Sequence, residues 1–423
     1  MAAPRIPIDS IYVDRGAVGT LKSKICESIV AQIASGTAIP GARLPSTRRL
    51  ATHIGVSRPT VALAYQDLAA LGFIQAKTRS AFHVADSPPI ESELTSVLSG
   101  RGEQPADARR SSIWEDRLDM TAIDQKRRIV KPADWRSYRY PFIYGQMDPA
   151  LFDTGAWREC ARRSLGKDDF FAMASDVAAA DDPLLIHQIR TQILPRRGIQ
   201  AGADEILVTI GAQNALWLAT QILSRTAKHA VCENPGYPDT ANGLRWGGVK
   251  VTHVDVDGDG LPPDAIPECA DVVFLSPSHQ APTGVTMPIY RRQQLMDLAQ
   301  KQNLIIVEDE YDFEMNFFSA PRKSLKATDE DGRVIYIGSF SKSIFPGIRL
   351  GYLVADKDFI ACAREIRGLM FRHPPGHLQR ITAYFISQGY YSAHLRRLKR
   401  IFTERRKVII EALHDFQITI ANP

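Results

Sequence analysis

Apolar residues recur every four positions near the start of the chain. The series consists of Leu21, Ile25, Ile29 and Ile33. Because this spacing places the four side chains on one face of a helix, a helix is predicted over residues 20–35. Two further helices are predicted after it, one capped by Ser46 and one capped by Ser57. Residues 73–84 then alternate loosely between apolar and polar side chains, which predicts a short β-hairpin.

A different pattern begins after residue 200, where short runs rich in β-branched residues alternate with helical stretches. The predicted strands are EILVTI (205–210), AVCEN (230–234), VTHVDV (251–256), DVVFLS (271–276), LIIVEDE (304–310) and VIYIGSF (334–340). Helices are predicted between several of them, for example over 211–225 and 288–303. This alternation is typical of an α/β domain with a largely parallel sheet.

The length of the chain separates these two patterns into domains. The chain has 423 residues, and a single hydrophobic core stops growing at roughly 250–300 residues. The segment from 86 to 135 is rich in Ser, Pro, Gly and charge, as linkers are. We therefore expect a small helical domain over 1–85, a linker over 86–135 and a large α/β domain over 136–423.

The net charge of +5 is distributed unevenly along the chain. Residues 1–85 hold ten Lys and Arg against four Asp and Glu, whereas the remaining 338 residues hold 42 against 43. All of the basic excess therefore lies in the small domain. This distribution indicates a polyanionic partner for the N-terminal part alone.

The remaining composition excludes several classes of protein. The five cysteines are scattered and form no CxxC pair, which argues against a disulfide framework or a zinc cluster. The N-terminus has no apolar run typical of a secretory signal, and nothing approaches 18 consecutive apolar residues. We expect a cytoplasmic protein with no membrane-spanning helix and no metal site.

The small domain has the pattern of a winged helix-turn-helix, namely a helix, a glycine-containing turn, a second helix and a hairpin. In such domains the first residues of the second helix of the pair face the base edges of the major groove. The residues expected there are Ser57, Arg58 and Thr60. Phosphate contacts are expected from Arg43 and Arg48 and, in the hairpin, from Arg79, because a guanidinium binds phosphate or guanine in a bidentate manner. The alternative is a three-helix protein-binding domain with a solvated basic face.

The most informative stretch of the large domain is GSFSKSIFPGIRLGYL, residues 338–353. It combines the hydroxyls of Ser339 and Ser341 with Lys342 and, seven residues further on, Arg349. Such a set can bind a phosphate while presenting an amine for a Schiff base, and pyridoxal phosphate needs both. Taken alone, the stretch also fits a surface lysine in a serine-rich turn.

An acidic run follows one of the predicted strands, in IIVEDEYDFE (305–314). Asp309 stands at the carboxyl end of the strand, where α/β proteins bind ligands. A carboxylate at this place can keep a pyridine nitrogen protonated, and Tyr311 can hydrogen-bond the phenolic oxygen of the same ring. The alternative for this run is a magnesium-binding acidic cluster.

Three further segments complete the pattern. In ILVTIGAQNALWL (206–218), the free amides of Ala212 and Gln213 at a helix N-terminus are suited to phosphate, although a structural strand–helix turn would look the same. In CENPGYPD (232–239), Tyr237 can stack on a flat ring or belong to the core. The third segment is the loop SPSHQAPTG (276–284).

These motifs, in this order, resemble the fold-type I pyridoxal-phosphate proteins of the aspartate aminotransferase superfamily. The segment LPSTRRLATHIGVSRPTVALAYQDLAALGFI (44–74) resembles the DNA-binding domain of GntR-type bacterial regulators. The whole chain is similar to the MocR family, which joins the two. The resemblance covers nearly the full length, including FIYGQMDPALFDTGAWRECARRSL (142–165), and implies a bacterial transcriptional regulator.

The resemblance also implies a role for each residue of the predicted site. Lys342 would form the internal aldimine with pyridoxal phosphate, Asp309 would pair with the pyridine nitrogen and Tyr311 with the phenolic oxygen. His279 would take the place of the asparagine that aminotransferases set near that oxygen, and Tyr237 would stack on the ring. The residues implied for the phosphate are Ser339, Ser341, Arg349, Ala212 and Gln213.

A MocR-type protein is expected to bind double-stranded operator DNA as a domain-swapped homodimer and to sense an amine or amino acid through external aldimine formation at Lys342. Two departures from the family pattern stand out. Residues 178–190 lack the usual Gly and Tyr, and we expect the small C-terminal subdomain, which carries an effector-binding arginine, to be incomplete. The competing functions are a catalytically active aminotransferase and, third, a DNA-binding protein without a cofactor.

Overall fold

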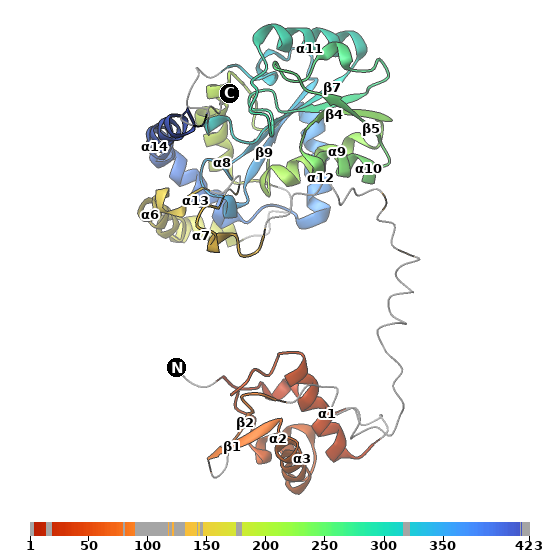
Figure 1. Cartoon of the computed structure of the whole chain (residues 1–423), viewed down its shortest axis with the longest axis vertical. Helices are drawn as coiled ribbons and strands as arrows, with labels where there is room; N and C mark the ends of the chain where they lie inside the picture. The colour runs from red at the N-terminus through yellow and green to blue at the C-terminus, as the bar shows by residue number, and fades with distance from the viewer. Residues whose placement is uncertain are drawn as a thin grey trace. The chain divides into compact units, whose positions relative to one another are not determined.

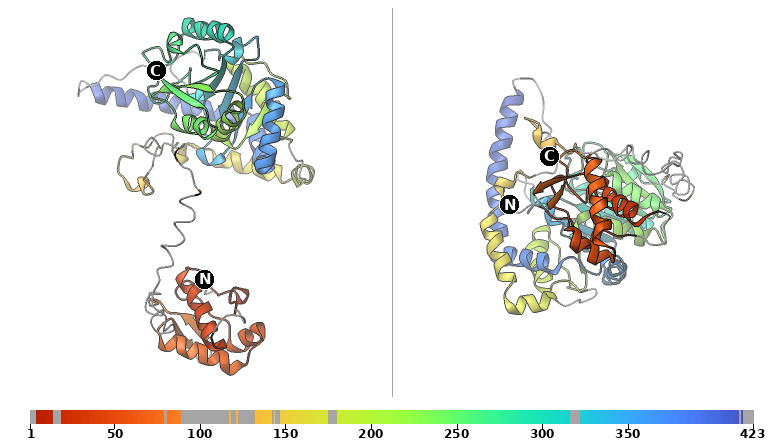
Figure 2. Two further views of the ribbon diagram at one scale, coloured as in Figure 1. Left: turned by 90° about the vertical axis from the view of Figure 1, so that its right-hand side faces the viewer. Right: turned by 90° about the horizontal axis from the view of Figure 1, so that it is seen from below.

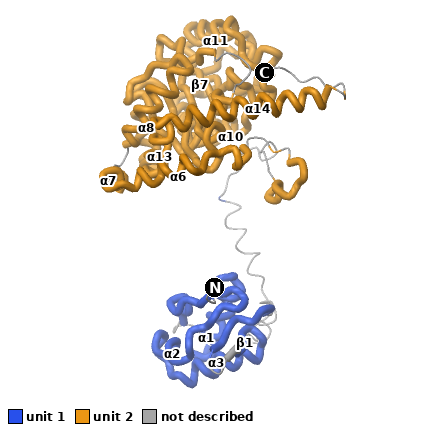
Figure 3. The backbone as a smooth tube through the Cα atoms, turned by 90° about the vertical axis from the view of Figure 1, so that its left-hand side faces the viewer, with its two compact units in different colours: residues 1–118 blue, residues 119–423 orange. Residues whose placement is uncertain are grey.

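The computed structural model describes residues 4–13, 19–78, 81–88, 117, 121, 132–141, 143, 147–174, 180–315, 322–414 and 416. The chain divides into two compact units, residues 1–118 and residues 119–423, and each is described by itself (Figure 3). Most of the predicted linker, 86–135, lies outside the described residues, so the predicted domain boundaries stay predictions.

Among its described residues, the first unit has three α-helices, one short helical turn and a two-stranded hairpin (Figure 1). Its elements are η1 (Ile8–Ser10), α1 (Leu21–Ala34), α2 (Thr47–Ile54), α3 (Arg58–Ala70), β1 (Ile74–Thr78) and β2 (Ala81–Val84). The predicted helices and the hairpin are confirmed. Ile25 and Ile29 on α1 are buried in the core of this unit, as their spacing predicted.

The turn between α2 and α3 follows from three residues. Gly55 ends α2 in the left-handed region, with φ of 68°. Glycine adopts this conformation with little strain because it has no Cβ. Ser57 then begins α3, and its hydroxyl accepts a hydrogen bond from the backbone N–H of Thr60 at 3.3 Å. Ser46 caps α2 in the same way through the N–H of Arg49. Both predicted serine caps are confirmed.

An N-terminal arm that the sequence pattern did not reveal packs on this unit. Ile6 and Ile11 are 6% and 2% exposed and belong to its core. The backbone N–H of Ile6 donates to the carbonyl of Arg43. Two isolated apolar residues lack the periodicity from which an element could be predicted.

The second unit is built on a seven-stranded sheet with the order β3-β9-β8-β7-β6-β4-β5. The strands are β3 (Ile206–Thr209), β4 (His229–Asn234), β5 (Lys250–Asp255), β6 (Val272–Leu275), β7 (Ile305–Glu310), β8 (Val334–Ser339) and β9 (Gly351–Val354). Six of them were predicted. The seventh, β9, pairs antiparallel with both β3 and β8, while the remaining neighbours are parallel.

Helices cover both faces of this sheet (Figure 1). The longer ones are α6 (Thr154–Ser164), α7 (Lys167–Ala174), α8 (Pro183–Gln188), α9 (Gly211–Leu223), α10 (Pro238–Trp246), α11 (Ile289–Gln302), α12 (Lys357–Phe371), α13 (Gly376–Ser387) and α14 (Tyr390–His414). Short turns of helix are η3 (Trp135–Ser137), η4 (Pro149–Leu151), η5 (Ile189–Ile193), η6 (Leu194–Arg197), η7 (Pro263–Ala265), η8 (Phe313–Met315), η9 (Lys326–Thr328) and η10 (Pro346–Ile348). The last turns of α14 project beyond the rest of the unit (Figure 2).

Side chains of each strand alternate between two hydrophobic cores, as the pleat requires. Leu207, Val307 and Ile337 pack with α9, α10 and α12 on one face. Residues next to them in sequence, such as Val208 and Ile306, pack on the opposite face. Within the described part of the chain, no helix is long and apolar enough to cross a membrane.

Candidate functional site

The predicted site residues of the large unit gather at one edge of the sheet. Strands β4, β6, β7 and β8 are mutually parallel, so their carboxyl ends share an edge. Asp309 and Ser339 stand at the ends of β7 and β8. Asp309 lies two residues after Val307 on β7, and Ser339 two residues after Ile337 on β8. Since alternate side chains of a strand share a face, both point to the face that α9 and α10 cover.

The start of β9, the first turn of α9 and the side chain of Arg349 meet at one place, here called the anion cradle. A Cβ atom on Gly351 would lie 2.8 Å from the carbonyl carbon of Gly211 and 3.0 Å from the backbone nitrogen of Ala212. Glycine at 351 thus lets the start of β9 touch the first turn of α9. Arg349, two residues earlier, brings its guanidinium to Gly211, whose added Cβ would lie 3.2 Å from Nη2.

The first turn of α9 keeps its amides available on this side. No side chain among the described residues caps the helix at Ile210, and Nη2 of Arg349 donates to the carbonyl of Ile210 at 3.4 Å. Free helix N-terminal amides and a guanidinium attract the same ligand, an anion. On β8, Ser339 is buried and its hydroxyl accepts a hydrogen bond from the N–H of Ser341 at 3.2 Å.

Asp309 carries a buried polar atom without a partner. Its Oδ1 is enclosed and has no hydrogen-bond partner among the described residues. Burial, reinforced by the neighbouring Glu310 and Asp312, raises the pKa of the Asp309 carboxyl to about 7. A buried acceptor of this kind calls for a donor, and a protonated ring nitrogen is one that would satisfy it.

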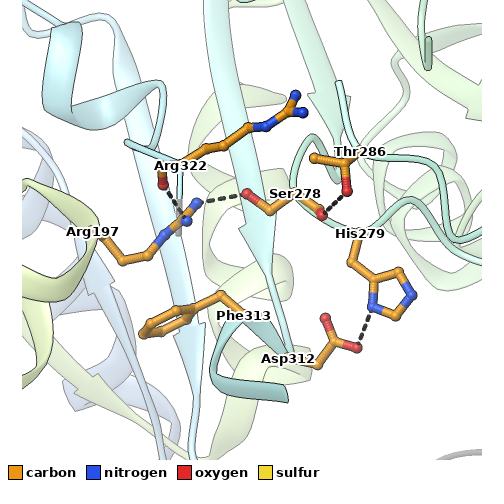
Figure 4. Close-up of a pocket in the computed structure, with 7 residues that line it drawn as sticks. All are labelled: Arg197, Ser278, His279, Thr286, Asp312, Phe313 and Arg322. Carbon is orange, nitrogen blue, oxygen red and sulfur yellow. Dashed lines mark hydrogen bonds and ion pairs between the residues drawn. The ribbon is translucent and has the colours of Figure 1, made fainter. Parts of the chain in front are cut away.

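Tyr311 and His279 lie beside Asp309. Their rings are nearly parallel, with centroids 6.1 Å apart, and Nδ1 of His279 contacts Oδ2 of Asp312 at 2.7 Å (Figure 4). This hydrogen bond raises the pKa of the His279 imidazole, and Lys342 is close enough to oppose the shift. Lys342 itself is partly buried in the turn after β8. The structure therefore brings Lys342 into the same site as Tyr311 and His279.

Tyr237 stands at the start of α10 and faces the first turn of α9. Its hydroxyl is 2.6 Å from Oε1 of Gln213 and 3.1 Å from Oδ2 of Asp239. Its ring is partly buried against the core that α9 and α10 form. Both interpretations of Tyr237, a ring-stacking residue and a core residue, are compatible with this position.

In the first unit, three of the arginines predicted to contact DNA are described, and Thr60 is half-buried. Arg43, Arg48 and Arg58 are exposed, and among the described residues none of them has an ion-pair partner. The hydroxyls of Ser57 and Thr60 contact each other at 2.7 Å, so both take part in the cap of α3. Arg79 lies outside the described residues.

Comparison with known proteins identifies both units. Residues 21–84 match the family "Bacterial regulatory proteins, gntR family", and residues 156–423 match "Aminotransferase class I and II". The HTH-type transcriptional regulator TauR of Rhodobacter capsulatus is 44% identical over 98% of this chain and 84% of its own length. The probable rhizopine catabolism regulatory protein MocR of Rhizobium meliloti is 29% identical over 95% of this chain and 78% of its own. The chain belongs to the MocR-type transcriptional regulators.

The fold of the large unit agrees with this assignment. A kynurenine aminotransferase from Pyrococcus horikoshii matches it with a TM-score of 0.60 and 23% identity, over 77% of this chain and 78% of that one. The likeness shows the fold, and the predicted architecture of a winged helix-turn-helix plus a fold-type I domain is confirmed. Class I and II aminotransferases are a pyridoxal-phosphate-dependent family, and GntR-type regulators bind operator DNA.

This MocR-type regulator also contains a buried ion pair that the sequence did not reveal. Arg197, 3% exposed, contacts Glu310 at 2.9 Å and donates to the hydroxyl of Ser278 at 2.6 Å. Arg197, Ser278 and Thr286 line one small pocket, in which the hydroxyl of Thr286 donates to the carbonyl of Ser278 (Figure 4). These bonds fix the loop that carries His279 against β7. The signal in the sequence was the acidic run 308–312 itself, but its partners lie far away along the chain.

Proposed function

We propose that this MocR-type regulator binds pyridoxal phosphate at the carboxyl edge of the large sheet and uses it to sense an amine or amino acid. The observation that carries the proposal is the buried Oδ1 of Asp309, which has no hydrogen-bond partner in the described part of the chain. It shares its face of the sheet with Ser339 and with the anion cradle of Arg349 and α9. A pyridine ring with a phosphate arm is one ligand that needs both features at once.

The cradle would bind the phosphate. Arg349 supplies a fixed positive charge, and the amides of Ala212 and Gln213 supply donors at a helix N-terminus. The hydroxyls of Ser339 and Ser341 lie on the turn that leads to Lys342. Glycine at 351 lets the start of β9 lie directly against Gly211 and Ala212, where a Cβ would meet backbone atoms.

The ring would be held by three side chains. Asp309 would accept a hydrogen bond from the protonated pyridine nitrogen, and Tyr311 would donate one to the phenolic oxygen. Tyr237 would pack on the face of the ring. Burial raises the pKa of the Tyr311 phenol, which keeps it a hydrogen-bond donor. When bound, pyridoxal phosphate supplies an aldehyde carbon that condenses reversibly with primary amines. Lys342 presents such an amine.

Sensing would follow from competition between two amines. An effector amine in the place of Lys342 Nζ would leave this side chain unattached. The ligand-bound and ligand-free states then differ in what holds the turn 339–349, and such a differential contact is what a ligand needs to shift an equilibrium.

Operator binding is assigned to the first unit. The exposed cations of α2 and α3 would bind the phosphates and bases of double-stranded DNA. We propose further that the protein is a homodimer in which the DNA-binding domain of one subunit rests on the large domain of the other. The predicted linker 86–135 is long enough to permit this exchange.

A spectroscopic titration tests the sensor. The purified protein, loaded with pyridoxal phosphate, is mixed with a panel of amines and amino acids while its visible absorbance and its affinity for a selected operator duplex are followed. A shift of the band that changes operator affinity, without turnover when a keto acid is added, supports the sensor. Sustained transfer over many turnovers would instead show a working aminotransferase. Absence of any cofactor band after loading would overturn the proposal.

A further inference from the structure

The solvent-facing side of α3 has an unusual composition. Its buried stripe consists of Val61, Ala64, Tyr65 and Leu68. The opposite stripe, at the same helical spacing, consists of Pro59, Leu63, Gln66 and Ala70, and all four are exposed. Leu63 leaves 51% of its surface exposed. The centre of the face is therefore apolar or amide-bearing and carries no charge.

The same two helices, α2 and α3, carry three exposed arginines. Arg58 opens α3, and Arg48 and Arg49 lie on α2; all three are exposed, and none has an ion-pair partner among the described residues. The acidic residue of α3, Asp67, is bound to Lys22 at 2.7 Å. An uncharged helix face in a unit that also carries exposed cations is complementary to a polyanion that presents uncharged groups between its charged edges. The major groove of a DNA duplex has this arrangement.

We propose that Leu63 and Gln66 read bases of the operator, with Leu63 contacting the methyl group of a thymine and Gln66 binding an adenine. An apolar side chain can recognise the C5-methyl of thymine, and a glutamine amide matches N6 and N7 of adenine in a bidentate manner. The inference rests on the proposed operator binding and adds specificity to it. It extends base reading from the cap residues of α3 into the second turn of the helix.

The geometry of a helix places these contacts relative to Arg58. With a rise of about 1.5 Å per residue, Leu63 lies roughly 7.5 Å further along the axis than Arg58. Base pairs are stacked about 3.4 Å apart, so where the axis follows the groove Leu63 meets a base roughly two steps away. Gln66 lies three residues, or about one helical turn, beyond Leu63 and therefore meets a base one or two steps further on.

Base analogues test each contact without altering the shape of the duplex. An operator is first selected from random duplexes with the wild-type full-length protein. Each thymine is then replaced by deoxyuridine, which lacks the methyl group, and each adenine by 7-deazaadenine, which lacks N7. Affinities are measured at one salt concentration for the wild type, Leu63→Ala, Gln66→Ala and the control Leu21→Ala. Leu21 is also an exposed leucine of this unit, 40% exposed, but lies at the start of α1.

For the wild type and Leu21→Ala, deoxyuridine at one position of each half-site is expected to weaken binding about fourfold, the worth of one buried methyl group. Leu63→Ala should bind the thymine and deoxyuridine duplexes equally. At an adjacent adenine, 7-deazaadenine should weaken the wild type roughly tenfold and leave Gln66→Ala unaffected.

Other outcomes overturn the inference. If Leu63→Ala is as sensitive to deoxyuridine as the wild type, or if no position of the wild-type complex is sensitive, Leu63 does not read thymine. If Leu63→Ala instead changes the sedimentation of the free protein and not its DNA affinity, the face binds a second copy of the chain. A wild-type protein that selects no duplex contradicts operator binding itself, and this inference with it.

Discussion

The phenolic hydroxyl of Tyr237 lies 2.6 Å from Oε1 of Gln213 and donates a hydrogen bond to it. Tyr237 stands at the start of α10 and Gln213 in the first turn of α9, so the bond joins the ends of two different strand–helix units. Asp239 Oδ2 is a second acceptor at 3.1 Å. Because a phenol has one proton, the two acceptors share it. The face that would pack on the cofactor ring is thereby tied to the turn that would bind its phosphate.

Tyr237→Phe separates packing on the cofactor ring from the hydrogen bond to Gln213. The variant keeps the ring but loses the hydrogen bond to Gln213, so the affinity for pyridoxal phosphate should fall by about 1 kcal/mol. Tyr290→Phe is a matched control, since Tyr290 also hydrogen-bonds a side-chain oxygen, that of Asp259, but on α11. Cofactor titration followed by absorbance measures both. Equal affinities for the wild type and Tyr237→Phe would show that the bond does not order the site.

Lys342→Ala removes the amine that the proposal assigns to the cofactor. The visible band of the loaded protein should disappear together with its response to amines, while operator affinity remains because the first unit is unchanged. Lys357→Ala, at the exposed start of α12, should retain the band. Persistence of the band in Lys342→Ala would assign the attachment to another residue.

Arg58→Ala tests the DNA face. If this guanidinium binds a base in a bidentate manner, operator binding should weaken by about 1–3 kcal/mol at matched salt. Arg225→Ala removes an equal charge from an exposed position of the large unit and should leave the affinity nearly unchanged. An unaltered affinity of Arg58→Ala is the result that removes it from the interface.

The raised pKa of Asp309 predicts how the stability of the apoprotein depends on pH. This carboxyl has an ordinary pKa of 3.8, and in the folded apoprotein its pKa is about 7. Between these values the folded chain binds the proton and the unfolded chain does not, so Asp309 lowers the free energy of unfolding as pH rises from about 4 to about 7, by at most about 4 kcal/mol.

Asp309→Asn removes that titration. Urea denaturation of the apoproteins at pH 5 and pH 8 should show a smaller loss of stability for Asp309→Asn than for the wild type. At pH 8, saturating pyridoxal phosphate should make the wild type more stable to urea than Asp309→Asn. The reason is that a ring nitrogen bearing a proton stabilises the ionised carboxylate of the wild type. Identical pH slopes for the two apoproteins would contradict the raised pKa that burial gives Asp309.

Gly351→Ala should close the anion cradle. The added Cβ would lie 2.8 Å from backbone atoms of Gly211 and Gly338, which cannot rotate away. We expect a cost of about 1–3 kcal/mol in the free energy of unfolding and loss of cofactor binding. Gly368→Ala is the control, since a Cβ there meets no atom within 4 Å in the middle of α12. That change should be neutral or stabilising by roughly 0.5–1 kcal/mol.

Local patterns predicted much of this structure. The caps at Ser46 and Ser57, the apolar face of α1 and six strands of the large sheet all follow from residues close together in sequence. Asp309 was also predicted at the carboxyl end of a strand, and it lies at the end of β7. Its role towards a cofactor stays a prediction.

Contacts between distant segments could not be predicted. The four residues of β9 follow directly on a turn, and their antiparallel place between β3 and β8 depends on the whole sheet. The pairing of Arg197 with Glu310 and the burial of Ile6 and Ile11 likewise depend on tertiary packing. No local periodicity records such contacts, because the partners lie far apart along the chain.

Strand β9 begins at the edge of the sheet where β8 ends, and it runs antiparallel to β8. Ser339, the last residue of β8, is paired in register with Gly351, the first residue of β9. Ser341, Lys342 and Arg349 all lie on the short connection between them. Opening of this one hairpin would release every one of these groups at once, and an occupied site would hold it shut. Hydrogen exchange at the β9 amides should therefore report the occupancy of the site.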